Sequence, residues 1–347
     1  MKRLFCGLLG LCLCLSFTAC GEPKKEKFSA YSFDYFDTST TVTGYEESRA
    51  EFDRVYAEVE RQLGEYHRLY DIYMPYEGVN NLYTVNQLVE GQHPTVRVDR
   101  RIIDLLLYAK EMYATTAGRM NVAMGSVLRL WHDYRTVGLD DPESASLPSM
   151  DRLEEAAEHT AIDNLVIDQK NSTVTLTDPG MRLDVGAIAK GYAVEQVARW
   201  LTQEGKTGYM LNVGGNVRAV GEKPDGTAWV AGLENPENPS GAYTALLELD
   251  HQALVTSGSY QRYYQVNGKR YHHIIHPDTL MPAEGYLAVS VVCPDSGMGD
   301  ALSTALFCMP LEQGKALVAS LPNVEAQWIA EDGTKTVSAG WNKYLKK

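Results

Sequence analysis

The sequence predicts an α+β fold in which antiparallel sheets and flanking helices form a single domain. Segments with apolar residues at helical spacing and short strand-like segments follow one another without the regular strand–helix alternation of a parallel sheet. We find no internal repeat and no break in composition that forces two independent domains. The 347 residues, 44% of them hydrophobic, are enough to bury an ordinary core.

Charge excludes one large class of function. The chain carries 32 Lys and Arg against 45 Asp and Glu, which gives a formal net charge of −13 at pH 7. Bulk nucleic-acid binding depends on Lys and Arg that neutralise phosphates, so no nucleic-acid partner is expected for this acidic chain. A ligand that bears phosphate would need a metal ion or a local basic group.

The N-terminus has the pattern of an export signal. Lys2 and Arg3 precede an apolar run at residues 4–17, which is too short to span a membrane comfortably, and a polar stretch follows at 22–27. The sequence Phe-Thr-Ala-Cys that ends at Cys20 resembles a bacterial lipobox, whose cysteine is diacylated and becomes the first mature residue. An ordinary secretory leader rich in cysteine is the alternative.

These signals divide the chain into three parts. We expect a signal peptide at 1–19, a lipid-anchored tether at 20–30 and the folded domain at 31–347. The lipid would hold the protein on the extracytoplasmic side of the cell membrane. The two remaining cysteines, Cys293 and Cys308, have apolar neighbours and are expected to be buried and free.

The first half of the body is expected to contain most of the long helices. Residues rich in Thr, Tyr and Phe predict one or two strands before a helix whose apolar residues recur every three or four positions. A second helix has Asp99 as its N-cap and ends at Gly118. The expected elements are strand at 31–45, helix at 46–70, helix at 99–118, a loop rich in Pro, Ser and Asp at 136–149, and a short helix at 150–159.

Strands are expected to dominate the second half. The Asn267-Gly268 pair is a strong hairpin signal, and two helical patterns precede a last hairpin at the C-terminus. The expected strands are 165–167, 174–176, 181–185, 209–220, 228–233, 243–249, 254–256, 326–330 and 336–338, and the expected helices are 187–204, 299–309 and 311–320.

A strand-to-helix turn at 184–193 combines an acid, a glycine and a lysine. Asp184 stands at the expected strand end, and Lys190 lies about one turn into the next helix. The free N–H groups of such a turn carry partial positive charge and suit a pyrophosphate. The spacing does not fit a Walker A loop, and residues 212–216 do not fit a dinucleotide-binding motif. A purely structural glycine turn is the alternative.

A second group of polar residues lies at 257–262 and 271–279. His273 can titrate near neutrality and is a candidate general base. A zinc site is not expected, because His272 and His273 are adjacent on a strand and point to opposite faces. The alternative is a structural histidine.

Asp300, Ser303 and Thr304 form the third group. Positions i, i+3 and i+4 share one face of a helix, so a carboxylate and hydroxyls lie together there. Such oxygen ligands suit Mg²⁺, which binds through one or two carboxylates together with substrate phosphates. The alternative is that Asp300 caps the helix and Thr304 packs or bonds to the backbone.

Together these segments resemble the ApbE family of flavin transferases over about residues 36–330. Several ordered motifs carry the resemblance. They are Phe-Asp-Thr at 36–38, a Tyr-rich stretch at 70–86, a Gly-flanked turn at 118–125, Asp-Val-Gly-Ala-Ile-Ala-Lys-Gly-Tyr-Ala at 184–193, Asn-Val-Gly-Gly-Asn at 212–216, Ser-Gly-Ser-Tyr-Gln-Arg at 257–262, His-Ile-Ile-His-Pro-Asp-Thr at 273–279 and Asp-Ala-Leu-Ser-Thr at 300–304.

The resemblance implies a T-fold-like ApbE-type domain and a role for each of these residues. The implied FAD contacts are Phe36, Tyr73, Arg119, Met120, Asn121, Asp184, Lys190 and Ile274. The implied Mg²⁺ ligands are the Ala187 carbonyl, Asp300 and Thr304, with Ser303 as a further candidate. His273 is the implied base.

The sequence departs from the family's usual pattern at three positions. Similar proteins usually have Asp where this chain has Asn121 and His276, and a common Gly where it has Leu280. Asn121 keeps the hydrogen-bonding shape of Asp without its charge. His276 affects the turn that follows His273.

The resemblance implies a Mg²⁺-dependent FAD:protein FMN transferase, with FAD as substrate. It would move FMN to a threonine hydroxyl of an exported acceptor, an electron-transfer subunit with a Ser/Thr-rich flavinylation motif, and release AMP. The alternatives are an extracytoplasmic FAD pyrophosphatase, in which water replaces the threonine, and a flavin-binding lipoprotein without turnover.

Overall fold

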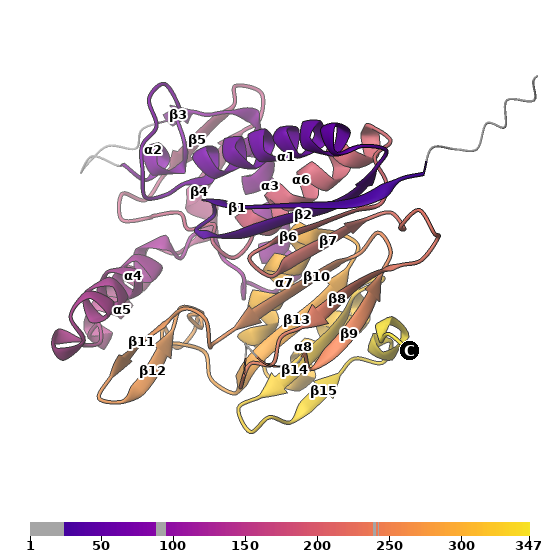
Figure 1. Ribbon diagram of the computed structural model, residues 1–347. Helices are drawn as coiled ribbons and strands as arrows, with labels where there is room; N and C mark the ends of the chain where they lie inside the picture. Colours follow the sequence, from indigo (N-terminus) through magenta and orange to yellow (C-terminus); the bar gives the residue numbers. More distant parts are fainter. Residues whose placement is uncertain (1–23, 88–94, 239–240, 242) are drawn as a thin grey trace, which may run out of the picture.

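The computed structural model describes residues 24–87, 95–238, 241 and 243–347, so the expected leader and Cys20 lie outside the described residues. An eight-stranded antiparallel sheet forms the centre of the fold, in the order β1-β2-β6-β7-β10-β13-β14-β15 (Figure 1). Its strands are β1 (Glu26–Tyr35), β2 (Thr38–Glu46), β6 (Tyr209–Val213), β7 (Asn216–Val220), β10 (Ala253–Gly258), β13 (Tyr286–Cys293), β14 (Glu325–Ala330) and β15 (Lys335–Val337).

Three small sheets and eight α-helices complete the described part of the chain. The small sheets are β3 (Thr95–Arg97) with β5 (Thr173–Leu176) and β4 (Leu165–Asp168), β8 (Trp229–Leu233) with β9 (Ala245–Leu249), and β11 (Tyr263–Val266) with β12 (Lys269–His272). The helices are α1 (Arg49–Tyr70), α2 (Leu82–Asn86), α3 (Arg100–Thr115), α4 (Gly125–Asp140), α5 (Met150–Ala157), α6 (Ala189–Gln203), α7 (Ser296–Phe307) and α8 (Leu311–Ser320). Within the described ranges, no helix has the length and apolar character that crossing a bilayer requires.

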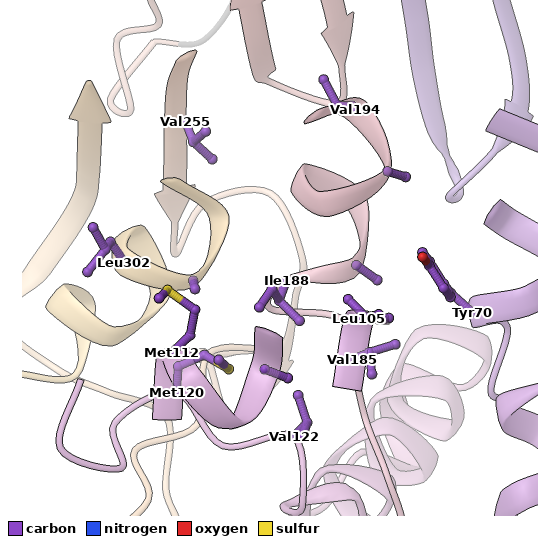
Figure 2. Close-up of a cluster of buried hydrophobic side chains, with 14 of the residues drawn as sticks. Tyr70, Leu105, Met112, Met120, Val122, Val185, Ile188, Val194, Val255 and Leu302 are labelled. Carbon is purple, nitrogen blue, oxygen red and sulfur yellow. The ribbon is translucent and has the colours of Figure 1, made fainter. Parts of the chain in front are cut away.

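The two faces of the central sheet bury separate hydrophobic cores, because successive residues of a strand point to opposite faces. Val255 of β10 belongs to the main core, in which α1, α3, α6 and α7 cover the sheet, whereas its neighbour Leu254 belongs to a second core under β8 and β9. Figure 2 shows part of the main core, which includes side chains of α3, α6 and α7 together with Met120 and Val122.

A third, smaller core joins α4 and α5 to the β11–β12 hairpin, at one side of the molecule (Figure 1). Trp131 of α4 packs there with Tyr264 of β11, and its indole Nε1 donates to the Leu280 carbonyl at 2.8 Å.

The structure confirms the α+β class and most of the expected elements. The long helix is present as α1, where Ser48 caps the N-terminus by accepting from the Glu51 N–H at 3.2 Å. Asp99 caps α3 as expected, accepting from the Arg101 N–H at 2.9 Å. Cys293 and Cys308 are free and buried. The hairpin at Asn267-Gly268 joins β11 and β12.

Several expectations about elements were wrong. The expected loop at 136–149 is helical as far as Asp140, because α4 continues to that residue. The expected strand 209–220 is the hairpin of β6 and β7, which turns at Gly214 and Gly215, both with positive φ. Strand β13 was not expected. The tether was expected to reach residue 30, but β1 already pairs with β2 from Glu26 onward.

The segment 181–185 is not a strand, because a side chain takes the place of a strand partner. The Asn86 amide donates from Nδ2 to the Leu183 carbonyl at 2.9 Å, and its Oδ1 accepts from the Leu183 N–H at 2.8 Å. The next N–H, of Asp184, donates to the Val122 carbonyl at 2.9 Å. These bonds fix the segment that leads into α6, although it does not pair as a strand of a sheet.

Helices α6 and α7 cross closely at Gly191. A Cβ added to Gly191 would lie 2.3 Å from the Ser296 carbonyl oxygen and 2.6 Å from Asp300 Cβ, so only glycine allows this approach. Ser296 in turn donates its hydroxyl to the buried Asn216 Oδ1 of β7. The crossing thus joins α6, α7 and the sheet at one point.

We predict that Gly191→Ala destabilises the fold by about 2 kcal/mol, because the added methyl would overpack the crossing. Urea unfolding at neutral pH measures the change in the free energy of unfolding. Gly314→Ala in α8 is the control, because its nearest contact would be Leu306 Cδ2 at 3.3 Å and helix propensity favours alanine. Equal stability of the two variants would contradict the close crossing.

Candidate functional site

Both oxygens of the Asp300 carboxylate are held by the N-terminal turn of α6. Lys190 Nζ lies 3.1 Å from Oδ1, and the Gly191 N–H donates to Oδ2 at 2.7 Å. The Gly191 N–H is thereby drawn away from the Ala187 carbonyl, its i−4 position, and in the described part of the chain no hydrogen bond reaches that carbonyl oxygen. Asp300 itself is 6% exposed.

Two hydroxyl groups of the neighbouring turn of α7 meet a third from β10. Ser257, near the end of β10, is 2.8 Å from Ser303 Oγ and 3.3 Å from Thr304 Oγ1. Ser303 is fully buried and also donates to the Asp300 carbonyl at 3.1 Å. Its hydroxyl is therefore used inside the protein, whereas Thr304 has only the longer contact. Ser257 was quoted in a motif but was not predicted as a site residue.

The oxygen donors in this region fit the chemistry of Mg²⁺. The Asp300 carboxylate, the Thr304 hydroxyl and the free Ala187 carbonyl are hard ligands, and one carboxylate is the number that a phosphate-bound Mg²⁺ commonly uses. Among the described residues, no group of three or more His, Cys, Asp or Glu side chains could hold a metal. This composition excludes a zinc-type cluster there but not a magnesium site of this kind.

Asp184 lies in the turn before α6. Its Oδ1 accepts from the Gly186 N–H at 2.8 Å, which stabilises the turn. Burial raises the pKa of the Asp184 carboxyl, while that hydrogen bond and the positive charge of His132 and Arg135 oppose the rise. The predicted turn therefore exists, although the strand expected before it does not.

Helix α4 brings two residues to the site that sequence reasoning missed. The His132 ring lies on Tyr73, with ring centroids 4.8 Å apart, and Arg135 Nη2 is 3.3 Å from His132 Nδ1. Burial, together with the nearby Asp184, raises the pKa of Tyr73 to about 12. The sequence did contain a signal for this helix: Val127 and Trp131 are spaced to form one apolar helix face, and His132 follows directly.

His272 and His273 have different surroundings, although they do not share a strand as expected, because β12 ends at His272. His272 Nε2 bonds the Ala283 carbonyl at 2.8 Å and Nδ1 accepts from the Ile274 N–H at 3.2 Å, so both of its ring nitrogens are used in the fold. His273 Nδ1 is 3.2 Å from the Arg262 carbonyl. A carbonyl only accepts, so Nδ1 carries the proton and Nε2 keeps a free lone pair.

Burial and nearby positive charge keep the His273 ring neutral. Burial is the largest cause, and the positive charges of Arg262 and Arg135 add to it, which lowers the pKa of His273 to about 3. Among the described residues, no carboxylate lies within salt-bridge distance of either guanidinium group. The site thus combines a neutral imidazole with two unpaired positive charges and an oxygen-rich corner at Asp300.

The residues of the predicted loop 119–121 differ in burial: Met120 is in the core, whereas Arg119 is partly exposed. Arg119 forms an ion pair with Asp278, in the turn after His273. The Met120 side chain is 1% exposed and packs in the main core, so a ligand could meet only its backbone. Asn121 donates to the Thr160 carbonyl at 3.0 Å and accepts from the Ala123 N–H at 2.9 Å.

Two further predicted contacts differ in their access to a ligand. Phe36 forms the turn between β1 and β2 with a φ of 56°, and its N–H donates to His67 Nδ1 at 3.3 Å. Its ring stands edge-on to His67, with centroids 5.6 Å apart. Ile274 is 4% exposed and lies in the main core, so it borders the site from behind.

The departures at His276 and Leu280 keep the shape of their turn. His276 Nδ1 accepts from the Asp278 N–H at 3.1 Å, a bond that an Asp carboxylate at this position would also make. Leu280 has a φ of 60°, in the region that favours glycine, which is the residue that similar proteins commonly have there. Leu280 is held in this conformation by its own packing in the third core.

The candidate site thus contains Lys190 beside the Asp300 carboxylate, and the guanidinium groups of Arg135 and Arg262 near His273. Comparison with known proteins identifies the family: the model of the ApbE family matches residues 36–328, and the chain belongs to this family. An FAD:protein FMN transferase of Klebsiella pneumoniae (strain 342) is 33% identical over 243 residues, 70% of this chain and 72% of its own length. One of Haemophilus influenzae is 28% identical over 99% of both chains. The crystal structure of the ApbE protein of Thermotoga maritima is similar with a TM-score of 0.80 and 27% identity, covering 93% of this chain and 100% of its own.

Proposed function

We propose that this chain is a Mg²⁺-dependent FAD:protein FMN transferase that attaches FMN to a threonine of an exported acceptor protein and releases AMP. The family and the names of the full-length relatives support transfer of FMN from FAD to protein. The observation that carries the site assignment is the meeting of Asp300, Thr304 and Lys190 where α6 crosses α7. FAD is the proposed substrate.

In the proposed reaction, the residues of this chain position the ligand and move one proton. The Ala187 carbonyl, Asp300 and Thr304 would hold Mg²⁺, which when bound supplies charge stabilisation to the pyrophosphate. Lys190 supplies further positive charge beside Asp300. Arg135 and Arg262 present unpaired guanidinium groups near His273. Such catalysis depends mainly on position and charge.

His273 is the proposed general base. Its free Nε2 would accept the proton of the threonine hydroxyl while that oxygen forms a bond to the flavin-side phosphorus of FAD. The bond from this phosphorus to the oxygen bridging to the adenosine-side phosphate breaks, and AMP leaves with the bond's electrons. Since Nδ1 is fixed to the Arg262 carbonyl, the ring keeps one orientation.

One incubation distinguishes the proposed function from its two alternatives. The purified protein is mixed with FAD, Mg²⁺ and an exported electron-transfer subunit that carries a Ser/Thr-rich flavinylation motif. A fluorescent acceptor band after denaturing electrophoresis supports the transferase. Release of free FMN and AMP without a labelled acceptor would indicate an FAD pyrophosphatase, and unchanged bound FAD would indicate a flavin-binding protein without turnover.

We also propose that Cys20 carries a lipid that holds the protein on the outer face of the membrane. The charged start, the short apolar run and the Phe-Thr-Ala-Cys sequence support this localisation. Cys20→Ser is expected to yield a soluble exported protein or an uncleaved precursor. Detergent-phase partitioning measures this, and a leader-cleaved Cys20→Ser protein that partitions like the wild type would contradict the assignment.

We predict that Asp300→Asn lowers FMN transfer at least 100-fold while FAD affinity changes only a few-fold. The amide can still accept from the Gly191 N–H, but it lacks the charge that Mg²⁺ requires. Turnover at saturating Mg²⁺ and FAD titration give the two values. Ser303→Ala is the control, because its buried hydroxyl is used within the fold, and a loss as large as that of Asp300→Asn would contradict this division.

We predict that His273→Ala lowers turnover by about 10² to 10⁴, the usual contribution of a general base. His272→Ala should instead lower stability, because both of its ring nitrogens bond to the backbone. The His273 pKa of about 3 leaves the ring unprotonated over the working range, so wild-type kcat/KM should not fall through this residue between pH 8 and pH 5. A His273-dependent acid limb near pH 6.5, or equal activity of both variants, would contradict the assignment.

A further inference from the structure

The two edges of the central sheet differ in length and protection. β15 closes one edge with only three residues, and short edge strands are one means by which sheets avoid pairing with other chains. β1 lies at the other edge, is ten residues long and contains no proline. In the described part of the chain, no strand pairs with its outer side. A long free edge of this kind can template a further strand.

The bonds between β2 and β6 show which side each residue of β2 faces. The Ser39 carbonyl accepts from the Gly214 N–H at 2.9 Å, and the Tyr45 N–H donates to the Gly208 carbonyl at 3.1 Å, both in the register of β2 with β6. Successive residues of a strand direct their N–H and C=O groups to opposite sides. The odd-numbered residues of β2 therefore bond toward β6 and the even-numbered residues toward β1.

The register of β1 with β2 then identifies the free backbone groups. Even-numbered residues pair with even-numbered residues, as in Ala30 opposite Val42. The backbone groups of Lys27, Ser29 and Tyr31 consequently point away from β2, to the free edge. Three N–H groups and three C=O groups are thus available to an added antiparallel or parallel strand.

The side chains of β1 favour a protein partner at this edge. Tyr31 is 75% exposed and Phe33 is 71% exposed, and their rings lie edge to face with centroids 6.4 Å apart. The intervening Ser32 faces the other way, where its hydroxyl donates to Glu60 of α1 at 2.8 Å. Exposed aromatic side chains beside a free edge offer apolar contact to an added strand.

The free edge leads into the candidate site. β1 ends at the turn of Phe36 and Asp37, and Arg262 Nη2 contacts the Asp37 carbonyl at 3.5 Å. The carbonyl of the same Arg262 holds the His273 ring at 3.2 Å. A chain that follows β1 toward its C-terminal end therefore arrives beside the proposed base.

We propose that the outer edge of β1 binds an extended segment of the acceptor protein as an added strand and thereby delivers its threonine to His273. This rests on the proposed function, which requires a protein substrate. Charge disfavours a second copy of the chain as the occupant, because two chains of net charge −13 repel each other. The strand itself carries charges of both signs, at Glu26, Lys27 and Asp34.

The test removes one outward N–H from the edge. Ser29→Pro deletes it while leaving the bonds of β1 to β2, since proline is tolerated on edge strands whose N–H faces solvent. Ser29→Ala is the matched control, because it also loses the hydroxyl contact to Thr43 but keeps the N–H. In the FMN-transfer assay with the acceptor subunit, Ser29→Pro should raise the KM for the acceptor about tenfold over Ser29→Ala, with unchanged kcat and FAD affinity. Equal KM values would overturn the proposal.

Amide hydrogen exchange tests the same edge in the wild-type protein, so the test does not depend on the folding of a variant. The amides of Lys27, Ser29 and Tyr31 should exchange quickly in the free protein and slowly with the acceptor, whereas those of Phe28 and Ala30 should be protected in both states. No gain in protection overturns the proposal.

Other results distinguish the failure of this proposal from that of the function. Protection by phosphatidylglycerol vesicles without the acceptor, or by self-association, would replace the acceptor with another occupant and overturn the proposal. A wild type that transfers no FMN disproves the proposed function and this docking edge together. An active wild type with an insensitive edge disproves the docking edge alone.

Discussion

The close crossing of α6 and α7 at Gly191 is the constraint on which the oxygen-rich corner depends. Because no side chain separates the helices there, the first turn of α6 reaches both oxygens of Asp300. The same contact draws the Gly191 N–H away from the Ala187 carbonyl, which is left free. Packing in this part of the molecule therefore determines which polar atoms remain available for chemistry.

A second constraint places positive charge near His273. The small core around Trp131 fixes α4 against the β11–β12 hairpin and the turn that follows it, so that Arg135 and Arg262 both act on His273. The neutral imidazole results from residues that are distant in sequence.

The edge strand β1 connects the molecular surface with the candidate site. β1 is the first described strand, and its N-terminal end overlaps the expected tether. Its C-terminal end leads into the turn at Phe36 and Asp37, which Arg262 contacts. The opposite sheet edge is short and leads to no predicted site residue. In the proposed docking of the acceptor, the free backbone of β1 is the route by which a chain segment reaches His273.

The sequence by itself determined the elements whose signals are local and the residues whose order along the chain matches a family. Helical spacing and caps predicted α1 and α3, the Asn267-Gly268 pair predicted its hairpin, and the ordered motifs indicated ApbE-type chemistry. The tertiary structure alone decided features that depend on distant partners. The Asn86 side chain replaces a strand pairing at Leu183, and α4 carries His132 and Arg135 to Tyr73. It also decided that Met120 and Ser303 are buried, because burial and pairing are set by what the fold places opposite a residue and not by its neighbours in sequence.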